Sequence, residues 1–254
     1  METTLYLIPN ILSDNTYESV LPAQVGEIVI RIRHFFVEDI KAARRFLIRM
    51  RHPVPIHELF FHELNEHTSS AEVLSFLPFL TSGDTGILSD AGVPALADPG
   101  AALVKLAHDN GIRVTPLVGP SSVPMALMAS GMNGQSFAFN GYLPIQQHER
   151  IRRIQALEQR SEKEGQTQIF IETPYRNMQL LKDLLSTCQP DSLLCIASEL
   201  TSADEFIATR RIRQWKQDLP DLNKKPTVFL LQRESITRRP SKKYEIRKNI
   251  LQNR

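Results

Sequence analysis

Short apolar runs alternate with longer amphipathic stretches along most of the chain, a pattern typical of strands joined by crossover helices. In the first half, apolar runs that end at turn residues predict strands at 5–8, 34–38, 59–62, 86–89 and 113–118. The stretches between these runs repeat their apolar residues at helical spacing. Because crossover connections join parallel strands, we predict an α/β fold with a mostly parallel N-terminal sheet.

The stretch that follows the second predicted strand is expected to form an amphipathic helix with a basic outer face. Its apolar face consists of Ile40, Ala43, Leu47 and Met50. Lys41, Arg45 and Arg49 follow one another at a spacing of four on a different face. The preceding segment 27–32 fits both a strand alternation and a helical stripe, and the pattern leaves both interpretations open.

Capping and breaking residues predict the helix boundaries in this half. Ser69 and Glu72 fit the start of a helix that continues to Leu80. Pro99 is expected in the first turn of the next helix, which Gly111 ends.

The turn-rich segment MNGQSFAFNGYLP at 132–144 separates the two halves, so we expect the domain linker around 119–144. Beyond it, the pattern predicts helices at 148–164 and 174–188, a short helix at Trp215, and strands at 167–172, 193–198, 204–209 and 226–231. The last three strands have short connections, which imply hairpins and a mixed C-terminal sheet with flanking helices. The predicted domains are 1–118 and 119–236, followed by a basic tail at 237–254.

The stretch LSDAGVPALADPG at 88–100 joins a strand end to a helix start, and this is where ligands lie in open α/β sheets. Ala91 and Gly92 would let a ligand approach the main chain, and Asp90 would offer an acceptor. A second strand end, VGPSS at 118–122, adds hydroxyls and a helix start. We expect these loops to leave adjacent strands and form one cleft. Alternatively, both loops are only tight turns in which the aspartates serve as turn or helix-capping residues.

Composition and charge narrow the possible functions. The chain has 254 residues and a net charge of +2, but the tail holds seven Lys or Arg against one Glu, which leaves 23 basic and 27 acidic residues elsewhere. Such a tail can follow a phosphate backbone or be merely solvated. No signal region and no membrane-length apolar run occurs in the sequence, so we expect a soluble, cytoplasmic protein without a membrane partner.

Several other chemistries are not supported. Neither GxxxxGK[ST] nor GxGxxG follows the first strand, which argues against a mononucleotide kinase or a dinucleotide-binding dehydrogenase. The segment HELFFHELNEH at 57–67 lacks HExxH, so we expect no zinc site. Cys188 and Cys195 suit reduced core thiols better than a disulfide.

The order of motifs along the chain resembles the tetrapyrrole-methylase-like, or class III, S-adenosylmethionine-dependent methyltransferases. Within that class it is most similar to the branch that methylates a 2'-hydroxyl of 16S ribosomal RNA. The motifs that carry the resemblance are FFVED (35–39), HELNE (62–66), LSDAGVPALADPG (88–100), GIRVTPLVGPSS (111–122), ALMASG (126–131), FNGYLP (139–144), IFIETPYR (169–176) and ASELT (197–201). They run in family order from about Leu5 to Leu231.

This resemblance implies a two-domain class III methyltransferase that binds S-adenosyl-L-methionine in the cleft between its domains and forms a homodimer. Its substrate would be ribosomal RNA or the small ribosomal subunit. By position, the residues that the resemblance assigns to the cofactor are Pro9, Asp90, Ala91, Val93, Ser121, Ser122, Glu172, Thr173, Ser198 and Thr227. Two segments depart from the branch, since IPNILSDNT stands in place of TPIGNLxDIT and EDIK in place of EDTR.

Methyl transfer from a sulfonium is an in-line displacement that needs no metal, but a ribose hydroxyl benefits from a nearby proton acceptor. Asp90 and Glu172 are the candidate catalytic residues, because both end strands that should face the cleft. Further candidates are Glu38, Asp39 and Glu199. Each of these carboxylates could instead serve only as a cap or an ion-pair partner.

Three functional interpretations follow. The leading one is a methyltransferase that acts on a ribose hydroxyl in small-subunit ribosomal RNA, with Arg176 and the 41–49 basic face holding phosphates. A charged helix face is, however, commonly just solvated. The second is a methyltransferase of the same fold that acts on a tetrapyrrole or other small molecule. The third is a relative that binds cofactor or RNA without catalysis.

Overall fold

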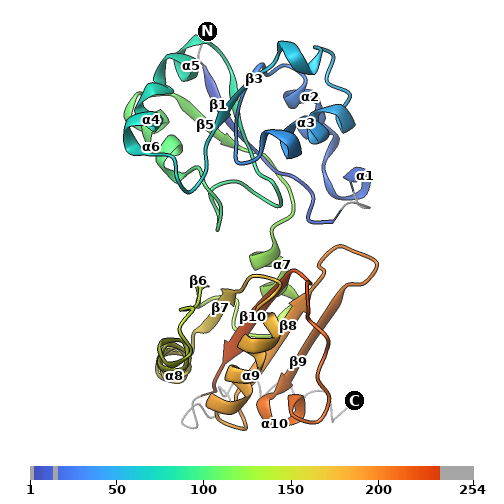
Figure 1. The fold of residues 1–254 in the computed structure, drawn as a ribbon, viewed down its shortest axis with the longest axis vertical. Coiled ribbons are helices and arrows are strands. Elements are labelled where there is room, and N and C mark those ends of the chain that lie inside the picture. The colour runs from blue at the N-terminus through green and yellow to red at the C-terminus, as the bar shows by residue number, and fades with distance from the viewer. Residues whose placement is uncertain (1–2, 14–16, 235–254) are drawn as a thin grey trace, which may run out of the picture. The chain divides into compact units, whose positions relative to one another are not determined.

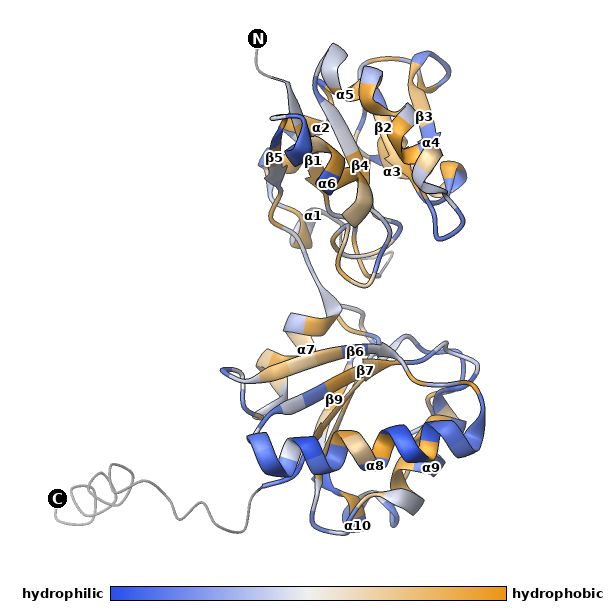
Figure 2. Cartoon of the chain, turned by 90° about the vertical axis from the view of Figure 1, so that its left-hand side faces the viewer, coloured by the Kyte–Doolittle hydropathy of each residue, from blue (hydrophilic) through white to orange (hydrophobic). Residues whose placement is uncertain are grey.

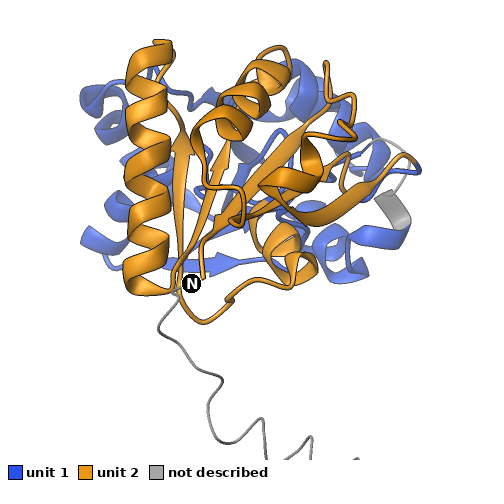
Figure 3. Cartoon of the chain, turned by 90° about the horizontal axis from the view of Figure 1, so that it is seen from below, with its two compact units in different colours: residues 1–122, 201–203 blue, residues 123–200, 204–254 orange. Residues whose placement is uncertain are grey.

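The chain, described here from a computed structural model, folds into two compact units, each built on its own five-stranded sheet (Figures 1 and 3). The structure describes residues 3–13 and 17–234. Unit 1 comprises Met1–Ser122 and Thr201–Ala203, and unit 2 comprises Val123–Leu200 and Asp204–Arg254. The boundary therefore follows Ser122, four residues beyond the predicted position. The predicted basic tail at 237–254 lies outside the described residues.

The sheet of unit 1 is entirely parallel, as predicted. Its strands are β1 (Thr4–Ile8), β2 (His34–Val37), β3 (Phe60–Glu63), β4 (Thr85–Leu88) and β5 (Arg113–Pro116). They lie in the order β3-β2-β4-β1-β5. The central strand β4 is buried along its whole length, which explains its nearly continuous apolar sequence.

Helices cover both faces of this sheet. They are α1 (Tyr17–Val20), α2 (Ala23–Val29), α3 (Ile40–Arg49), η1 (Ile56–Glu58), α4 (Ser70–Ser75), α5 (Leu77–Ser82) and α6 (Ala101–Asp109). One core joins α2 and α3 to Phe35, and the other joins α4, α5 and α6 to Phe36, the next residue along β2. The ambiguous segment 27–32 thus forms the last turn of α2, which ends at Val29, and the turn after it, and its apolar residues Val29 and Ile32 are buried.

Three predicted boundaries in this half are wrong. The helix expected from Ser69 to Leu80 is divided at Phe76 into α4 and α5, because Pro78 suits a first helical turn and cannot donate within a helix. Pro99 precedes α6, whose N-cap is Gly100 with a φ of 133°. The expected linker at 119–144 contains α7 (Ser122–Ser130), which agrees with the predicted helix start at 118–122, but also β6 (Phe137–Tyr142), which was not predicted.

The sheet of unit 2 is mixed, which confirms the prediction. The order is β6-β7-β10-β8-β9, formed by β6, β7 (Thr167–Ile171), β8 (Leu193–Ser198), β9 (Phe206–Arg211) and β10 (Thr227–Gln232). Only β6 and β7 are parallel among these neighbours. The helices α8 (Gln147–Glu164), α9 (Asn177–Thr187) and α10 (Ile212–Trp215) complete the unit.

The core of unit 2 contains Phe170, Phe229 and Trp215, which are fully buried. Along α8, apolar residues that join this core alternate with strongly polar ones (Figure 2). This pattern explains why the sequence predicts a charged amphipathic helix there. None of the helices in the described ranges is long and apolar enough to span a membrane.

Candidate functional site

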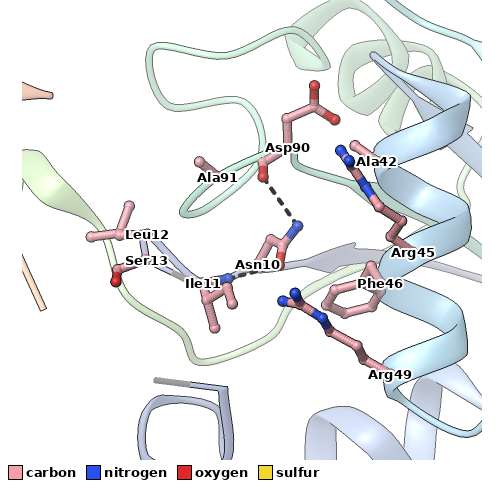
Figure 4. Close-up of a pocket in the computed structure, with 10 residues that line it drawn as sticks. All are labelled: Asn10, Ile11, Leu12, Ser13, Ala42, Arg45, Phe46, Arg49, Asp90 and Ala91. Atoms are coloured by element: carbon pink, nitrogen blue, oxygen red, sulfur yellow. Dashed lines mark hydrogen bonds between the residues drawn. The ribbon is translucent and has the colours of Figure 1, made fainter. Parts of the chain in front are cut away.

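In unit 1, the segment after β1 is tied to the loop that follows β4. The backbone of Asn10 pairs with Gly92 in both directions, with N–O distances of 2.8 and 3.2 Å. The Asn10 side chain donates to the carbonyls of Ser89 at 3.2 Å and Asp90 at 3.1 Å (Figure 4). Its own oxygen accepts from the amide of Ile11 at 2.8 Å. Asn10 therefore fixes the start of the 88–100 loop, a role that the sequence analysis missed.

The strand order corrects one expectation, because the loops at 88–100 and 118–122 do not leave adjacent strands. β1 lies between β4 and β5, so Pro9 and Asn10 separate the two loops. Gly119 packs so tightly on Pro9 that an added Cβ would lie 2.2 Å from the Pro9 Cβ. Three strand ends therefore contribute to this edge, and only a residue without a side chain fits at position 119.

The loop at 88–100 has an unusual backbone. Gly92 and Gly100 have φ angles of 76° and 133°, and the non-glycine residues Ala95 and Ala97 have φ angles of 63° and 60°. The left-handed region costs about 1–2 kcal/mol for a residue with a Cβ. The loop folds back on itself, with the amide of Ala95 donating to the Pro99 carbonyl at 3.3 Å.

A pocket of about 280 Å³ opens beside this loop (Figure 4). Its lining residues are Asn10, Ile11, Leu12, Ser13, Ala42, Arg45, Phe46, Arg49, Asp90 and Ala91. One wall comes from α3 and carries two guanidinium groups, and the other comes from the loops after β1 and β4. The spacing of four between Arg45 and Arg49 predicted a shared helix face, but not that this face borders the Asp90 loop.

Carboxyl groups gather beside the pocket and shift one another's pKa. Desolvation raises the pKa of Asp90, and the Asp39 charge raises it further, while Arg45 lowers it. Burial raises the pKa of Glu38, with the Asp90 charge adding to the effect. Burial, opposed by a hydrogen bond with Ser89, raises the pKa of Asp98 to about 7. Asp98 and Glu38 act on each other as well, and the Glu38 charge raises the pKa of Asp98 further.

In unit 2, the predicted hydroxyl residues lie at one edge of the sheet. Thr227 at the start of β10 pairs in register with Ser198 at the end of β8. The Thr227 hydroxyl donates to the Ser198 hydroxyl at 3.0 Å or to the Lys225 carbonyl at 2.9 Å. Glu172 and Thr173 follow β7, whose carboxyl end lies at the same edge.

Glu172 is held firmly by its neighbours. Its side chain is only 1% exposed, and Oε1 accepts from Arg176 Nη2 at 2.7 Å and Nε at 3.0 Å. The same oxygen accepts from the amide of Thr173 at 2.6 Å. An oxygen that already accepts three hydrogen bonds, two of them from a guanidinium, holds those donors in a fixed position.

The residues that the sequence assigned to the cofactor are divided between the two units. In unit 1, Pro9 is buried, Val93, Ser121 and Ser122 are half-buried, and Asp90 and Ala91 are exposed. Ser122 begins α7. Glu172, Thr173, Ser198 and Thr227 form the set in unit 2. Across residues 3–13 and 17–234, no group of three or more His, Cys, Asp and Glu is placed to hold a metal ion.

Comparison with solved structures identifies the fold. Methyltransferase CobJ matches with a TM-score of 0.58 and 17% identity over 93% of this chain and 95% of that one. Diphthine synthase matches with a TM-score of 0.61 and 13% identity over 91% and 89% of the two chains. Cobalt precorrin-4 methyltransferase CbiF matches with a TM-score of 0.55 and 14% identity over 90% of this chain and 94% of that one. The chain therefore has the two-domain fold of the class III methyltransferases, as predicted.

Curated relatives identify the family. The ribosomal RNA small subunit methyltransferase I of Mesorhizobium japonicum is 31% identical over 216 residues, which are 84% of this chain and 69% of that protein. The Xylella fastidiosa protein of the same name is 32% identical over 190 residues, 72% of this chain and 67% of the relative. No protein-family model matches the sequence. The chain belongs to the ribosomal RNA small subunit methyltransferase I family and is a methyltransferase, which confirms the resemblance.

The length of the match differs among these relatives. The chain spans 61% of the Pasteurella multocida relative and 49% of the Vibrio cholerae one. These relatives therefore contain sequence that the match to this chain does not reach.

Proposed function

We propose that this protein transfers a methyl group from S-adenosyl-L-methionine to a ribose 2'-hydroxyl of small-subunit ribosomal RNA. The observation that carries the proposal is the 31% identity to the Mesorhizobium japonicum methyltransferase over 84% of the chain. This match includes both units, because 84% of the chain exceeds the length of either one.

The residues present suit the proposed cofactor. In unit 1, Gly92 adopts a left-handed conformation, and a Cβ there would contact Leu12 and the Pro120 carbonyl. Ala91 is small and exposed at this loop, and Ser121 and Ser122 supply hydroxyls. When bound, S-adenosylmethionine supplies the activated methyl group on its sulfonium. In unit 2, the proposed cofactor-binding residues are Glu172, Thr173, Ser198 and Thr227.

We assign the proton-accepting role to Asp90. Its carboxylate lies at the pocket that Figure 4 shows, and desolvation raises its pKa toward the range in which a base is effective. Glu172, by contrast, is tied to Arg176. We therefore propose that Glu172 orients Arg176 and the Thr173 amide at the second set, and that it does not remove the substrate proton.

The decisive experiment follows a labelled methyl group from S-adenosylmethionine to small ribosomal subunits purified from cells that lack this gene. Naked ribosomal RNA is tested alongside. Label on a ribose, located by nuclease digestion and mass spectrometry, is the expected result. The Asp90→Asn variant should lose about 10²–10⁴-fold in turnover, the usual contribution of general-base catalysis. Cofactor binding by the wild type without label on any RNA would contradict the proposal.

Two further features complete the proposal. A ribosomal substrate implies a cytoplasmic site of action, which fractionation of cells tests. The homodimer implied by the resemblance is tested by light scattering on the purified chain, and a single-chain mass across concentrations would contradict it.

A further inference from the structure

The pocket beside the 88–100 loop has a divided chemistry. Arg45 and Arg49 form one side, and Asp90 stands on the other. Phe46, Ile11 and Leu12 add apolar surface. A ligand that fits must combine a negative group, an apolar part and a group that can donate a proton to Asp90.

We propose that this pocket holds one nucleotide unit of the RNA, with Arg45 and Arg49 binding the phosphate next to the target ribose. This inference rests on the proposed function, because it names the part of the RNA that the site recognises. The two arginines are one helical turn apart, which is about 6 Å along the axis. Their forked guanidinium groups suit a phosphate better than point charges would.

The size of the pocket limits what enters it. A volume of about 280 Å³ lies at the small end of pockets for small molecules, which span roughly 300–1,000 Å³. It accommodates a single nucleotide unit, whereas a paired helix could reach it only by extruding one nucleotide. The pocket therefore favours an unpaired or flipped nucleotide, a common form in which enzymes modify nucleic acid.

Asn10 is committed to the loop and is not available to such a ligand. Its side-chain nitrogen donates to two loop carbonyls, and its oxygen accepts from Ile11. Within the lining set, charged recognition thus falls to Arg45, Arg49 and Asp90. With the phosphate held by the arginines, the ribose hydroxyl next to it is brought toward the carboxylate.

The chain provides a matched control on the same helix. Arg44 is exposed and carries the same charge, but its guanidinium lies 5.5 Å over the Phe61 ring and does not line the pocket. Arg45→Ala would also change the pKa of Asp90, because Arg45 lowers that pKa. Arg45→Lys keeps the positive charge and removes the forked guanidinium group.

The experiment measures equilibrium binding of a short single-stranded ribosomal RNA segment, cofactor binding by calorimetry, and the kinetic constants for RNA. Arg49→Ala should weaken RNA binding and raise KM about tenfold or more, with cofactor affinity unchanged. Arg44→Ala should stay within twofold of wild type. The slope of log affinity against log salt should become shallower by about 0.7 for each phosphate that a variant no longer binds.

Equal losses for Arg44→Ala and Arg49→Ala would overturn the inference, because diffuse charge would then explain binding. Unchanged RNA affinity in Arg49→Ala would overturn it as well. A nucleoside 3',5'-bisphosphate should compete for the pocket and the parent nucleoside should not. If these binding results hold while no RNA is methylated, the proposed function fails and the pocket assignment stands.

Discussion

The two units differ in how their carboxylates are partnered. In unit 2, the buried charges have strong partners, as Arg150 binds Asp183 and Arg176 binds Glu172. In unit 1, desolvation is the main cause that raises the pKa of Glu38, Asp90 and Asp98, and neighbouring carboxylates raise each pKa further. A buried charge needs its partner, because the loss of one leaves the other uncompensated, whereas carboxyl groups with perturbed pKa values cluster at functional sites. The contrast points to unit 1 as the location of the proton chemistry.

The largest expected effect comes from breaking a buried pair in unit 2. Arg150 Nη2 lies 2.6 Å from Asp183 Oδ2, and both side chains are nearly inaccessible. Arg150→Ala should lower the free energy of unfolding by about 3–5 kcal/mol, because Asp183 would stay buried without its partner. Urea denaturation measures the change. Arg160→Ala is the control, since its pair with Glu164 is solvent-exposed, and it should cost less than about 1 kcal/mol.

A smaller effect is expected in unit 1 at Gly119. A Cβ there would approach Pro9 within 2.2 Å, so Gly119→Ala should cost about 1–3 kcal/mol through overpacking. It should also weaken cofactor binding, because it moves the proposed Ser121 loop. Gly134→Ala meets no atom within 4 Å and serves as the control. Thermal unfolding and calorimetry measure both, and equal behaviour of the two variants would contradict the prediction.

The smallest effect is a change in pH dependence. Asp98 has a pKa of about 7 in the folded state, against about 3.9 for an unfolded chain. Between these values the folded state binds more protons, so the contribution of Asp98 is complete below about pH 4 and is lost as the pH rises through about 7. Asp98→Asn should remove this part of the pH dependence. The difference in free energy of unfolding between the variant and wild type should therefore favour the variant more at pH 8 than at pH 5. Denaturant titrations at both pH values test this.

The sequence predicted the character of both sheets because local patterns contain that information. Crossover lengths distinguish parallel strands from hairpins, and burial on both faces makes β4 apolar apart from Thr85. The order of the strands is not local, so the position of β1 between β4 and β5 was missed. β6 was taken for a linker because an edge strand is only half-buried and keeps turn-forming residues such as Asn140 and Gly141.

The candidate site was predicted in part. The 88–100 loop was recognisable from its composition and motif, but the hydrogen bonds that give each residue its role were not. Asn10 reads as an ordinary turn residue until its side chain is seen on the Ser89 and Asp90 carbonyls. Asp98 reads as a cap until its contact with Glu38 is known. Both contacts join segments that are far apart in the sequence.

The left-handed alanines of the 88–100 loop have a consequence for the entropy of binding. Ala95 and Ala97 sit at φ angles near 60°, and Pro94 and Pro99 restrict the same stretch further. A loop held in this way loses its conformational freedom when the chain folds, and not when a ligand arrives. Replacing Ala95 by glycine would relieve the local strain, yet every binding event would then have to order a looser loop.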